Sequence, residues 1–159
     1  MTTTIRGFRL TDYDAVISLW RASPGVTLRD ADARAALTAY IQRNAGLSFV
    51  ATDANLIVGA VLCGTDGRRG YLQHLAVAVS HRRQGIGREL AERCVRALAE
   101  RGIDKCHLMV VSDNHDATAF WTRIGWVERT DIRLMSHTSS GVATAKRYGA
   151  ADPYCTLNS

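Results

Sequence analysis

The sequence predicts an α+β domain whose sheet is mixed and mostly antiparallel, with a parallel strand pair at its centre. Two observations predict this class. In the first half of the chain, the short apolar runs at residues 47–52 and 56–63 are separated by Asp53-Ala-Asn55, as in a β-hairpin. In the second half, a strand, a helix and another strand follow one another, and this order requires a parallel crossover.

The first half supplies one strand, two helices and then two hairpin strands, which together indicate an antiparallel meander. Loose apolar alternation predicts a strand over residues 4–10, and a capping-box-like start at residues 11–14 predicts a helix that ends before Ser23-Pro-Gly25. A second helix is predicted over residues 30–43, because its apolar residues share one face. The hairpin strands follow this helix.

The second half begins with a buried strand over residues 75–79 and a helix over residues 85–101, and a strand over residues 105–111 comes next. A short helix then ends at Gly125, and residues 126–135 fit a final strand or strand pair. The elements sum to six to seven strands flanked by about four helices.

Length and composition favour one domain. With 159 residues, of which 47% are hydrophobic, the chain can bury one core, and we assign residues 1–137 to the domain and residues 138–159 to a tail of unknown role. The net charge of +5 favours an anionic partner. Because the basic residues are spread along the chain, no nucleic-acid partner is expected, and the lack of a long apolar run predicts no membrane association and a cytoplasmic protein.

The four cysteines show no paired spacing. Cys63, Cys94 and Cys106 lie within apolar strand or helix patterns, whereas Cys155 lies in the tail. We therefore expect buried reduced thiols rather than disulfides, and we predict no metal site.

A strand that ends in an arginine-rich and glycine-rich turn before a helix is typical of a phosphate-binding loop. This turn falls near residues 82–87, where Gly85 and Gly87 let the backbone approach a ligand closely. The first amides of a helix have no partner within it, and the helix dipole adds about half a positive charge there. The turn therefore suits a phosphate or a pyrophosphate.

The motif Arg82-Arg-Gln-Gly85-Ile-Gly87 resembles the phosphate-binding signature of the GNAT superfamily of acyl-CoA-dependent N-acyltransferases. The residues Leu75-Ala-Val77 precede it at the family's distance, and the pattern from Asn114 to Trp126 resembles the second family motif. The resemblance covers roughly residues 4–136 and implies the GNAT fold. Glycine pairs of this kind also occur in nucleotide-binding proteins, so a nucleotide site is a further alternative.

The resemblance implies a site for acetyl-CoA along this strand and turn. The turn amides would bind the pyrophosphate, and the Val77 N–H would polarise the thioester carbonyl. Asn114 would contact the pantetheine arm, although an asparagine in this place is also an ordinary N-cap. Trp121 stands where many relatives have a tyrosine that serves as the general acid. Trp121 either packs in the core or forms a wall beside the thioester. The cofactor-binding residues implied are Val77, Val79, Arg82, Arg83, Gln84, Gly85, Ile86, Gly87, Arg88, Asn114 and Trp121.

The base that the reaction needs is less clearly indicated. In several relatives the base lies early in the strand that leads into the glycine-rich turn, at positions that correspond to Tyr71 and Gln73. Neither of these residues is a strong base. His74 has a suitable side chain, but strand alternation sends it to the opposite face unless a bulge intervenes. An ordered water held by Gln73, Tyr71 or backbone carbonyls is the other interpretation. His81 and the remaining histidines show no partner constellation.

The resemblance implies an N-acetyltransferase that moves the acetyl group of acetyl-CoA to a primary amine by direct attack. The amine belongs to a small molecule or a protein, and the oligomeric state is left open, a homodimer included. A non-catalytic acyl-CoA-binding or interaction module on the same fold is the alternative.

Overall fold

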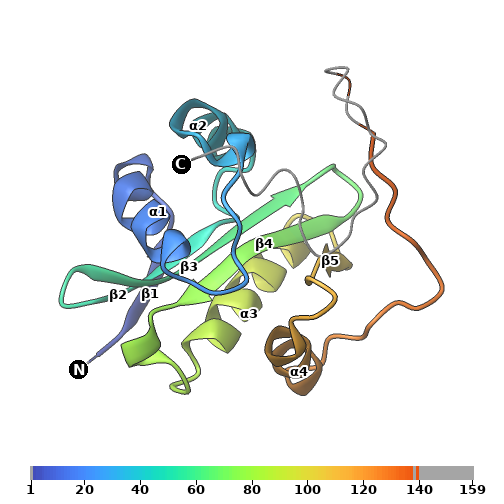
Figure 1. Ribbon diagram of the computed structural model, residues 1–159. Coiled ribbons are helices and arrows are strands. Elements are labelled where there is room, and N and C mark those ends of the chain that lie inside the picture. Colours follow the sequence, from blue (N-terminus) through green and yellow to red (C-terminus); the bar gives the residue numbers. More distant parts are fainter. Residues whose placement is uncertain (1, 138, 140–159) are drawn as a thin grey trace.

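Five strands form one mixed sheet in the order β1-β2-β3-β4-β5 in the computed structural model, which describes residues 2–137 and 139 (Figure 1). The first four strands pair as antiparallel neighbours, and β5 runs parallel to β4. This confirms the α+β class with a parallel strand pair, but the pair lies at one edge of the described sheet and not at its centre, because β5 is the last strand in the order. The strands are β1 (Thr4–Gly7), β2 (Phe49–Asp53), β3 (Leu56–Thr65), β4 (Gly70–Val77) and β5 (Cys106–Leu108).

Helices cover both faces of the sheet, and the four α-helices among the described residues agree with the prediction of about four. On one face lie α1 (Tyr13–Arg21) and α2 (Arg34–Arg43). On the other lies α3 (Ile86–Ala99), with α4 (His115–Arg123) beside it (Figure 1). Short 3₁₀ turns stand before α1, α2 and α3, namely η1 (Leu10–Asp12), η2 (Asp30–Asp32) and η3 (Val79–His81).

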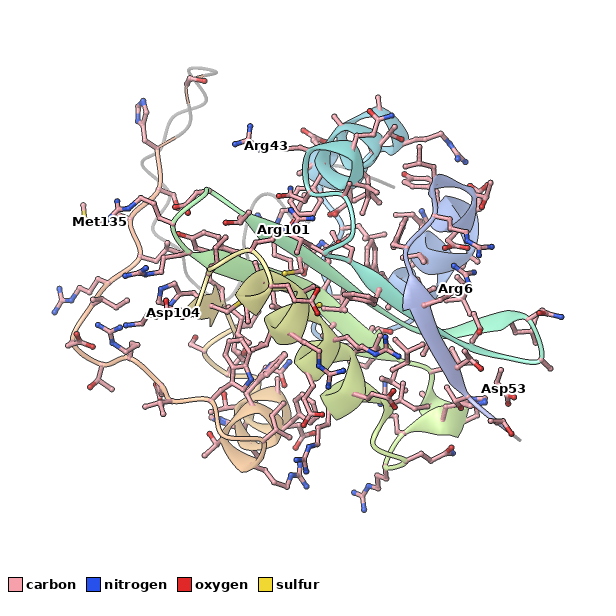
Figure 2. All side chains as sticks on the ribbon, turned by 180° about the vertical axis from the view of Figure 1, so that it is seen from behind. Arg6, Arg43, Asp53, Arg101, Asp104 and Met135 are labelled. Atoms are coloured by element: carbon pink, nitrogen blue, oxygen red, sulfur yellow. The ribbon has the colours of Figure 1, made fainter. Side chains whose placement is uncertain are left out.

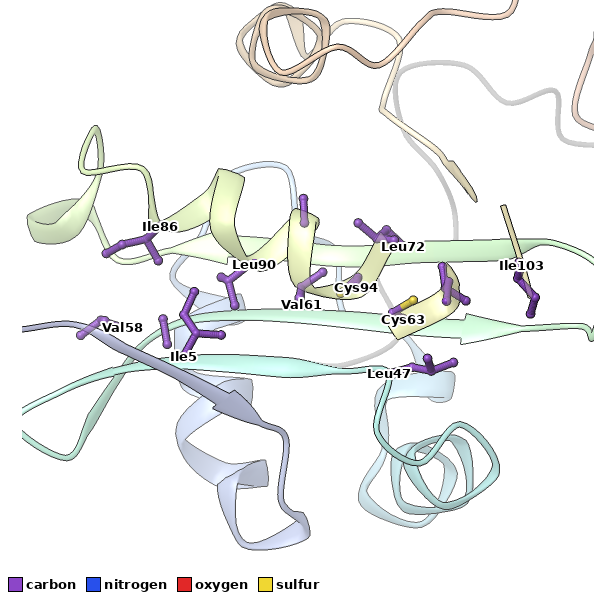
Figure 3. Close-up of a cluster of buried hydrophobic side chains, with 13 residues drawn as sticks. Ile5, Leu47, Val58, Val61, Cys63, Leu72, Ile86, Leu90, Cys94 and Ile103 are labelled. Atoms are coloured by element: carbon purple, nitrogen blue, oxygen red, sulfur yellow. The ribbon is translucent and has the colours of Figure 1, made fainter. Parts of the chain in front are cut away.

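Each face of the sheet carries its own apolar core. Under α3, the buried side chains of Leu90, Cys94 and Leu98 pack with others from the sheet, including Val61 and Leu72 (Figure 3). The spacing of these three helical residues is what the sequence predicted. Trp20 is fully buried in the second core, which also contains residues of α1, α2 and β3. Cys63 and Cys94 are buried free thiols, Cys106 is half-buried and free, and Cys155 lies outside the described residues.

The prediction of six to seven strands is wrong, because residues 126–135 form no strand. Gly125, at φ +97°, ends α4 in a turn in which the Trp126 amide donates to the Trp121 carbonyl (2.9 Å). The chain then leaves the sheet (Figures 1 and 2), and Met135 is 91% exposed. A strand needs a partner with open backbone groups, and β5 offers only three residues.

Several strand ends also differ from the prediction. Strand β1 stops at Gly7, since the Asp12 carboxylate accepts the Arg9 amide and closes η1 (2.8 Å). Strand β4 stops at Val77, since the His81 amide donates to the Ala78 carbonyl and closes η3. Val79 therefore lies outside the central strand, and its side chain is 72% exposed. Strand β5 covers three of the seven residues predicted.

None of the helices in the described part of the chain has the length and apolar character needed to cross a membrane. The predicted tail at residues 138–159 lies outside the described residues, apart from residue 139.

Candidate functional site

A cleft opens where β4 and β5 separate. The two strands pair only at Gly70–Leu72 with Cys106–Leu108. Beyond this point a space of about 160 Å³ lies between them, closed on one side by the loop after α1 and on another by α4. Its lining consists of Pro24, Gly25, Val26, Leu72, Gln73, His74, Leu75, Leu108, Met109, Val110, Val111, Asn114, Ala117 and Trp121.

A β-bulge in β4 shapes this cleft. Ala60 pairs with Ala76, but Leu62 pairs with Gln73, so that His74 and Leu75 together face the single residue Val61. His74 has φ +54°, which is uncommon for a residue with a side chain. The bulge that His74 needs in order to share a face with Gln73 is therefore present.

The bulge directs His74 to the same face as Gln73. Leu72 packs in the core under α3, so alternation puts Gln73 on the face of α1. The His74 ring packs edge-on against Trp20 of α1, with ring centroids 5.0 Å apart. Its Nε2 lies 2.9 Å from Oδ1 of Asp32. Sequence reasoning missed Asp32, because the two residues are far apart in the chain and no local pattern joins them.

Asp32 is held firmly in η2. Its side chain is 9% exposed, and its Oδ2 accepts the Arg29 amide at 2.9 Å. The Tyr13 hydroxyl donates to its backbone carbonyl at 2.8 Å. The carboxylate that faces His74 therefore has a fixed direction.

Tyr71 does not line the cleft, whereas Gln73 and His74 do. The Tyr71 hydroxyl lies 3.4 Å from Oδ2 of Asp66, and its ring packs near His107, with centroids 6.0 Å apart. The structure thus brings together two of the three predicted candidates for the base.

Two amides of β4 point into the gap between β4 and β5. The Ala78 amide donates to the Val58 carbonyl of β3 at 2.8 Å, and amide directions alternate along a strand. The amides of Leu75 and Val77 therefore point away from β3. Leu75 lines the cleft and Val77 does not, so Leu75 is a candidate that sequence reasoning missed. Its signal is the bulge, which the sequence alone did not place.

The predicted phosphate loop forms the start of α3. Arg83 (φ +60°) and Gly85 (φ +81°) adopt left-handed backbone, and the helix begins at Ile86. Within the described residues, the amides of residues 83–88 have no backbone acceptor, because the first helical bond is from the Glu89 amide to the Gly85 carbonyl. The amides therefore lie free at the positive end of the helix, an arrangement that suits an anion.

The arginine side chains of the loop make different contacts. Arg82 Nε donates to the Val77 carbonyl at 3.0 Å and holds the end of β4. Arg88 pairs with Glu92 at 2.7 Å along the exposed face of α3. Nε2 of the Gln84 side chain donates to the Ser80 carbonyl at 3.4 Å. These side chains make separate contacts, so the feature that the loop residues share is their free backbone amides.

Helix α4 joins the loop to the cleft. A Cβ placed on Gly87 would lie 3.3 Å from Cζ of Phe120 and 3.7 Å from Cγ2 of Val77, so these three elements meet there. The next residue of α4, Trp121, lines the cleft and also packs against the core under α3. Its ring makes edge contacts with Phe120 and Trp126, both at 5.0 Å. Trp121 therefore packs against the core and also lines the cleft, and its place beside a thioester stays a prediction.

Asn114 is the N-cap of α4, because its Oδ1 accepts the Ala117 amide at 3.0 Å. It also lines the cleft. The capping bond uses only its oxygen, so a contact of its amide group with a pantetheine arm stays a prediction.

The expectation that His81 has no partner constellation is wrong. Its Nδ1 lies 2.8 Å from Ser80 Oγ, and its Nε2 lies 3.1 Å from Asp53 Oδ2. Asp53 ends β2, so these contacts tie η3 to β2 just before the phosphate loop. No local pattern indicates this pairing, since Asp53 belongs to a hairpin that is distant in the chain. Over the described residues, no group of three or more His, Cys, Asp or Glu side chains is arranged to hold a metal ion.

The sequence is similar to known acetyltransferases. The profile of the acetyltransferase (GNAT) family matches residues 13–126. An acetyltransferase of Sodalis glossinidius is 30% identical over 131 residues, which cover 82% of this chain and 92% of that protein. An acetyltransferase of Pectobacterium atrosepticum is 35% identical over 120 residues, which cover 76% of this chain and 84% of that protein.

The fold is similar to that of solved N-acetyltransferases. The PaiA N-acetyltransferase of Thermoplasma acidophilum, in complex with coenzyme A, matches with a TM-score of 0.72 at 21% identity, over 82% of this chain and 94% of that one. At this identity the likeness shows the fold alone. The family profile spans most of the chain, and a relative 30% identical covers nearly all of its own length. The chain therefore belongs to the GNAT family of acetyltransferases.

Proposed function

We propose that this acetyltransferase moves the acetyl group of acetyl-CoA to a primary amine by direct attack. One observation carries the proposal: α4 touches the phosphate loop at Gly87 through Phe120 and lines the cleft through Trp121. An anion site and an acyl-sized cleft that share one wall suit a donor with a pyrophosphate at one end and a thioester at the other. The neighbour that contains coenzyme A supports this donor.

The loop binds the donor through its backbone. The amides of residues 83–88 are free of backbone acceptors at the N-terminus of α3, and a hydrogen bond to a charged group contributes roughly 1.5–3 kcal/mol. The pantetheine arm then lies along the open edge of β4, where the amides of Val77 and Leu75 point outward.

The thioester carbonyl is polarised by the amide of Leu75 rather than by that of Val77. Both amides face the gap, but only Leu75 belongs to the cleft lining. A fixed N–H group aimed at the developing oxyanion contributes roughly 10²–10³-fold to the rate.

A non-catalytic module that binds acyl-CoA is the second candidate, and Trp121 favours it. An indole N–H cannot donate a proton to the leaving thiolate near neutral pH. Water can serve instead, so this observation does not outweigh the cleft.

The test measures thiol release from acetyl-CoA with a panel of amines: kanamycin, spermidine, Nα-acetyl-lysine and a peptide with an N-terminal alanine. The last amine is included because a neighbour of this fold is a ribosomal-protein-S18-alanine N-acetyltransferase. Amine-dependent release supports the proposal. Saturable binding of acetyl-CoA without thiol release for any amine supports the non-catalytic module. A protein that does not bind acetyl-CoA would reject both candidate functions.

A matched pair of glycine variants tests the donor site. Gly85 (φ +81°) and Gly102 (φ +76°) lie at opposite ends of α3, and a Cβ on either would meet nothing within 4 Å. Both Gly→Ala changes carry the same backbone penalty of about 1–2 kcal/mol. We expect Gly85→Ala to weaken acetyl-CoA binding about tenfold, the equivalent of about 1.4 kcal/mol, and Gly102→Ala to leave it unchanged. Equal effects in the two variants would reject the loop as the pyrophosphate site.

A further inference from the structure

We infer that Asp32 positions His74 as the general base of the reaction, an inference that rests on the proposed N-acetyltransferase function. The acceptor is protonated near neutral pH, since a lysine-like amine has a pKa near 10.4 and about one molecule in a thousand is neutral. A group beside the acetyl donor must therefore remove its proton. His74 lies in the cleft lining next to Leu75, and Asp32 fixes its orientation.

The bond to Asp32 defines which nitrogen of His74 is free. A carboxylate only accepts, so Nε2 carries the proton in the 2.9 Å contact with Oδ1 of Asp32. Neutral imidazole then has its lone pair on Nδ1. Among the described residues, Nδ1 has no hydrogen-bond partner, and the His74 side chain is 22% exposed. His74 can therefore accept a proton at Nδ1 without breaking its bond to Asp32.

Three further features hold the imidazole in place. The bulge with φ +54° sets its direction, the edge contact with Trp20 fixes its plane, and the Arg29 amide holds the carboxylate of Asp32. An imidazolium formed at His74 would lie directly against a carboxylate. This is the arrangement in which an acidic residue orients a histidine base and stabilises its charged form.

The other two candidates are less suited to this role. Gln73 lines the cleft but has no basic group, and the Tyr71 hydroxyl lies at Asp66, outside the lining. Asp32 is the acidic side chain in contact with His74. The polar group next to Asp32 is the Tyr13 hydroxyl, which donates to the Asp32 backbone carbonyl.

The proton balance of the step is complete. Nδ1 of His74 takes one proton from the ammonium, and the neutral nitrogen forms a bond to the thioester carbon. When the C–S bond breaks, the second proton on that nitrogen passes to the coenzyme A thiolate, directly or through water. His74 returns its proton to solvent, so each turnover gives an amide, a thiol and one proton.

The test compares His74→Gln, Asp32→Asn and wild type with the panel amine that gives the highest wild-type rate. Near neutral pH we expect kcat/KM to fall about 100-fold in His74→Gln and about tenfold in Asp32→Asn. The dissociation constant of acetyl-CoA should stay within about twofold, because His74 does not touch the phosphate loop. His115→Gln, an exposed histidine at the start of α4, is the control and should retain wild-type activity.

The pH dependence separates a base from a structural residue. As pH rises toward the pKa of the amine, the neutral fraction grows about tenfold per unit and the base becomes dispensable. The ratio of wild-type to His74→Gln activity should therefore shrink with pH, and added imidazole should restore part of the activity of His74→Ala.

A ratio that stays constant with pH, or a His74→Gln variant as active as wild type, would overturn the inference while leaving the proposed function intact. Wild-type protein that binds acetyl-CoA but acetylates no amine of the panel would overturn both. Circular dichroism and acetyl-CoA affinity verify that each variant is folded.

Discussion

A Cβ placed on Gly25 would lie 2.4 Å from Nδ2 of Asn114, so the loop after α1 and the N-cap of α4 are in direct contact at the cleft. Gly25 also has φ +82°, a conformation that residues with side chains rarely adopt. Position 25 therefore favours glycine over other residues for two independent reasons, the backbone conformation and the close approach of Asn114. The second reason involves the candidate site.

We predict that Gly25→Ala lowers both stability and the affinity for acetyl-CoA. The backbone penalty is about 1–2 kcal/mol, and the new methyl group displaces Asn114 from the cleft. Thermal denaturation and calorimetric titration with acetyl-CoA measure the two effects. Gly67→Ala is the control, because Gly67 has φ +90° and nothing within 4 Å of its Cβ position. It should lose stability alone, and a similar loss of affinity would contradict the steric explanation.

The ion pair of Arg6 and Asp12 should make stability depend on acid pH. The two side chains form paired contacts of 2.7 and 2.9 Å, and Asp12 is 7% exposed. Burial by itself raises the pKa of Asp12, but hydrogen bonds from the Arg6 side chain and the Arg9 amide outweigh it, so the pKa is lowered overall. Such a group contributes its full stability above the unfolded pKa of about 3.9, and the contribution is lost as pH falls through the lower folded pKa.

We therefore predict that Asp12→Asn lowers the free energy of unfolding by about 2 kcal/mol near neutral pH. The difference from wild type should shrink as pH falls below about 4, and urea unfolding at several pH values measures it. Asp14→Asn is the matched control, because Asp14 pairs with Arg34 on the exposed surface and should matter little. A difference for Asp12→Asn that persists unchanged at low pH would contradict the assignment.

Gly70 and Leu98 should be energetically coupled. A Cβ on Gly70 would lie 2.2 Å from Cδ1 of Leu98, which is 1% exposed and cannot move aside. Gly70→Ala should cost about 1–3 kcal/mol through overpacking, and Leu98→Ala about 2–5 kcal/mol through a cavity. The double variant should be more stable than the sum of both losses predicts, because the new methyl group enters the new space. Strict additivity in denaturant unfolding would contradict the contact.

The cysteines should be slow to react in the folded protein. Cys63 and Cys94 are fully buried, and the hydrogen bond with Cys63, together with burial, raises the pKa of the Cys106 thiol. In a Cys155→Ser variant, a thiol reagent should therefore label Cys63, Cys94 and Cys106 only slowly under native conditions. Rapid labelling is expected in guanidinium chloride. Fast native labelling of Cys63 or Cys94 would contradict their burial.

Local patterns in the sequence predicted the elements that depend on neighbours along the chain. The spacing of Ile86, Leu90, Cys94 and Leu98 predicted α3 and its buried face. The motif around Gly85 predicted the turn before it, because a left-handed glycine and the free amides of a helix start are set within a few residues. The role of these amides in binding coenzyme A stays a prediction.

Strand pairing could not be predicted as well. Residues 126–135 contain alternating apolar residues, yet the structure describes no strand there and Leu134 is 75% exposed. An alternating pattern indicates only that a segment can pair. Whether it does depends on the three residues of β5 and on where the chain goes after Gly125.

By itself, then, the sequence determined the α+β class, the order of the elements as far as α4 and the turn at residues 82–87, because local patterns along the chain indicate each of them. Only the tertiary structure decided the direction of His74 and its partner. The bulge arises from the register between β3 and β4, and Asp32 reaches His74 because α1, η2 and β4 pack together. Such contacts join residues that are distant in the chain, and no local pattern records them.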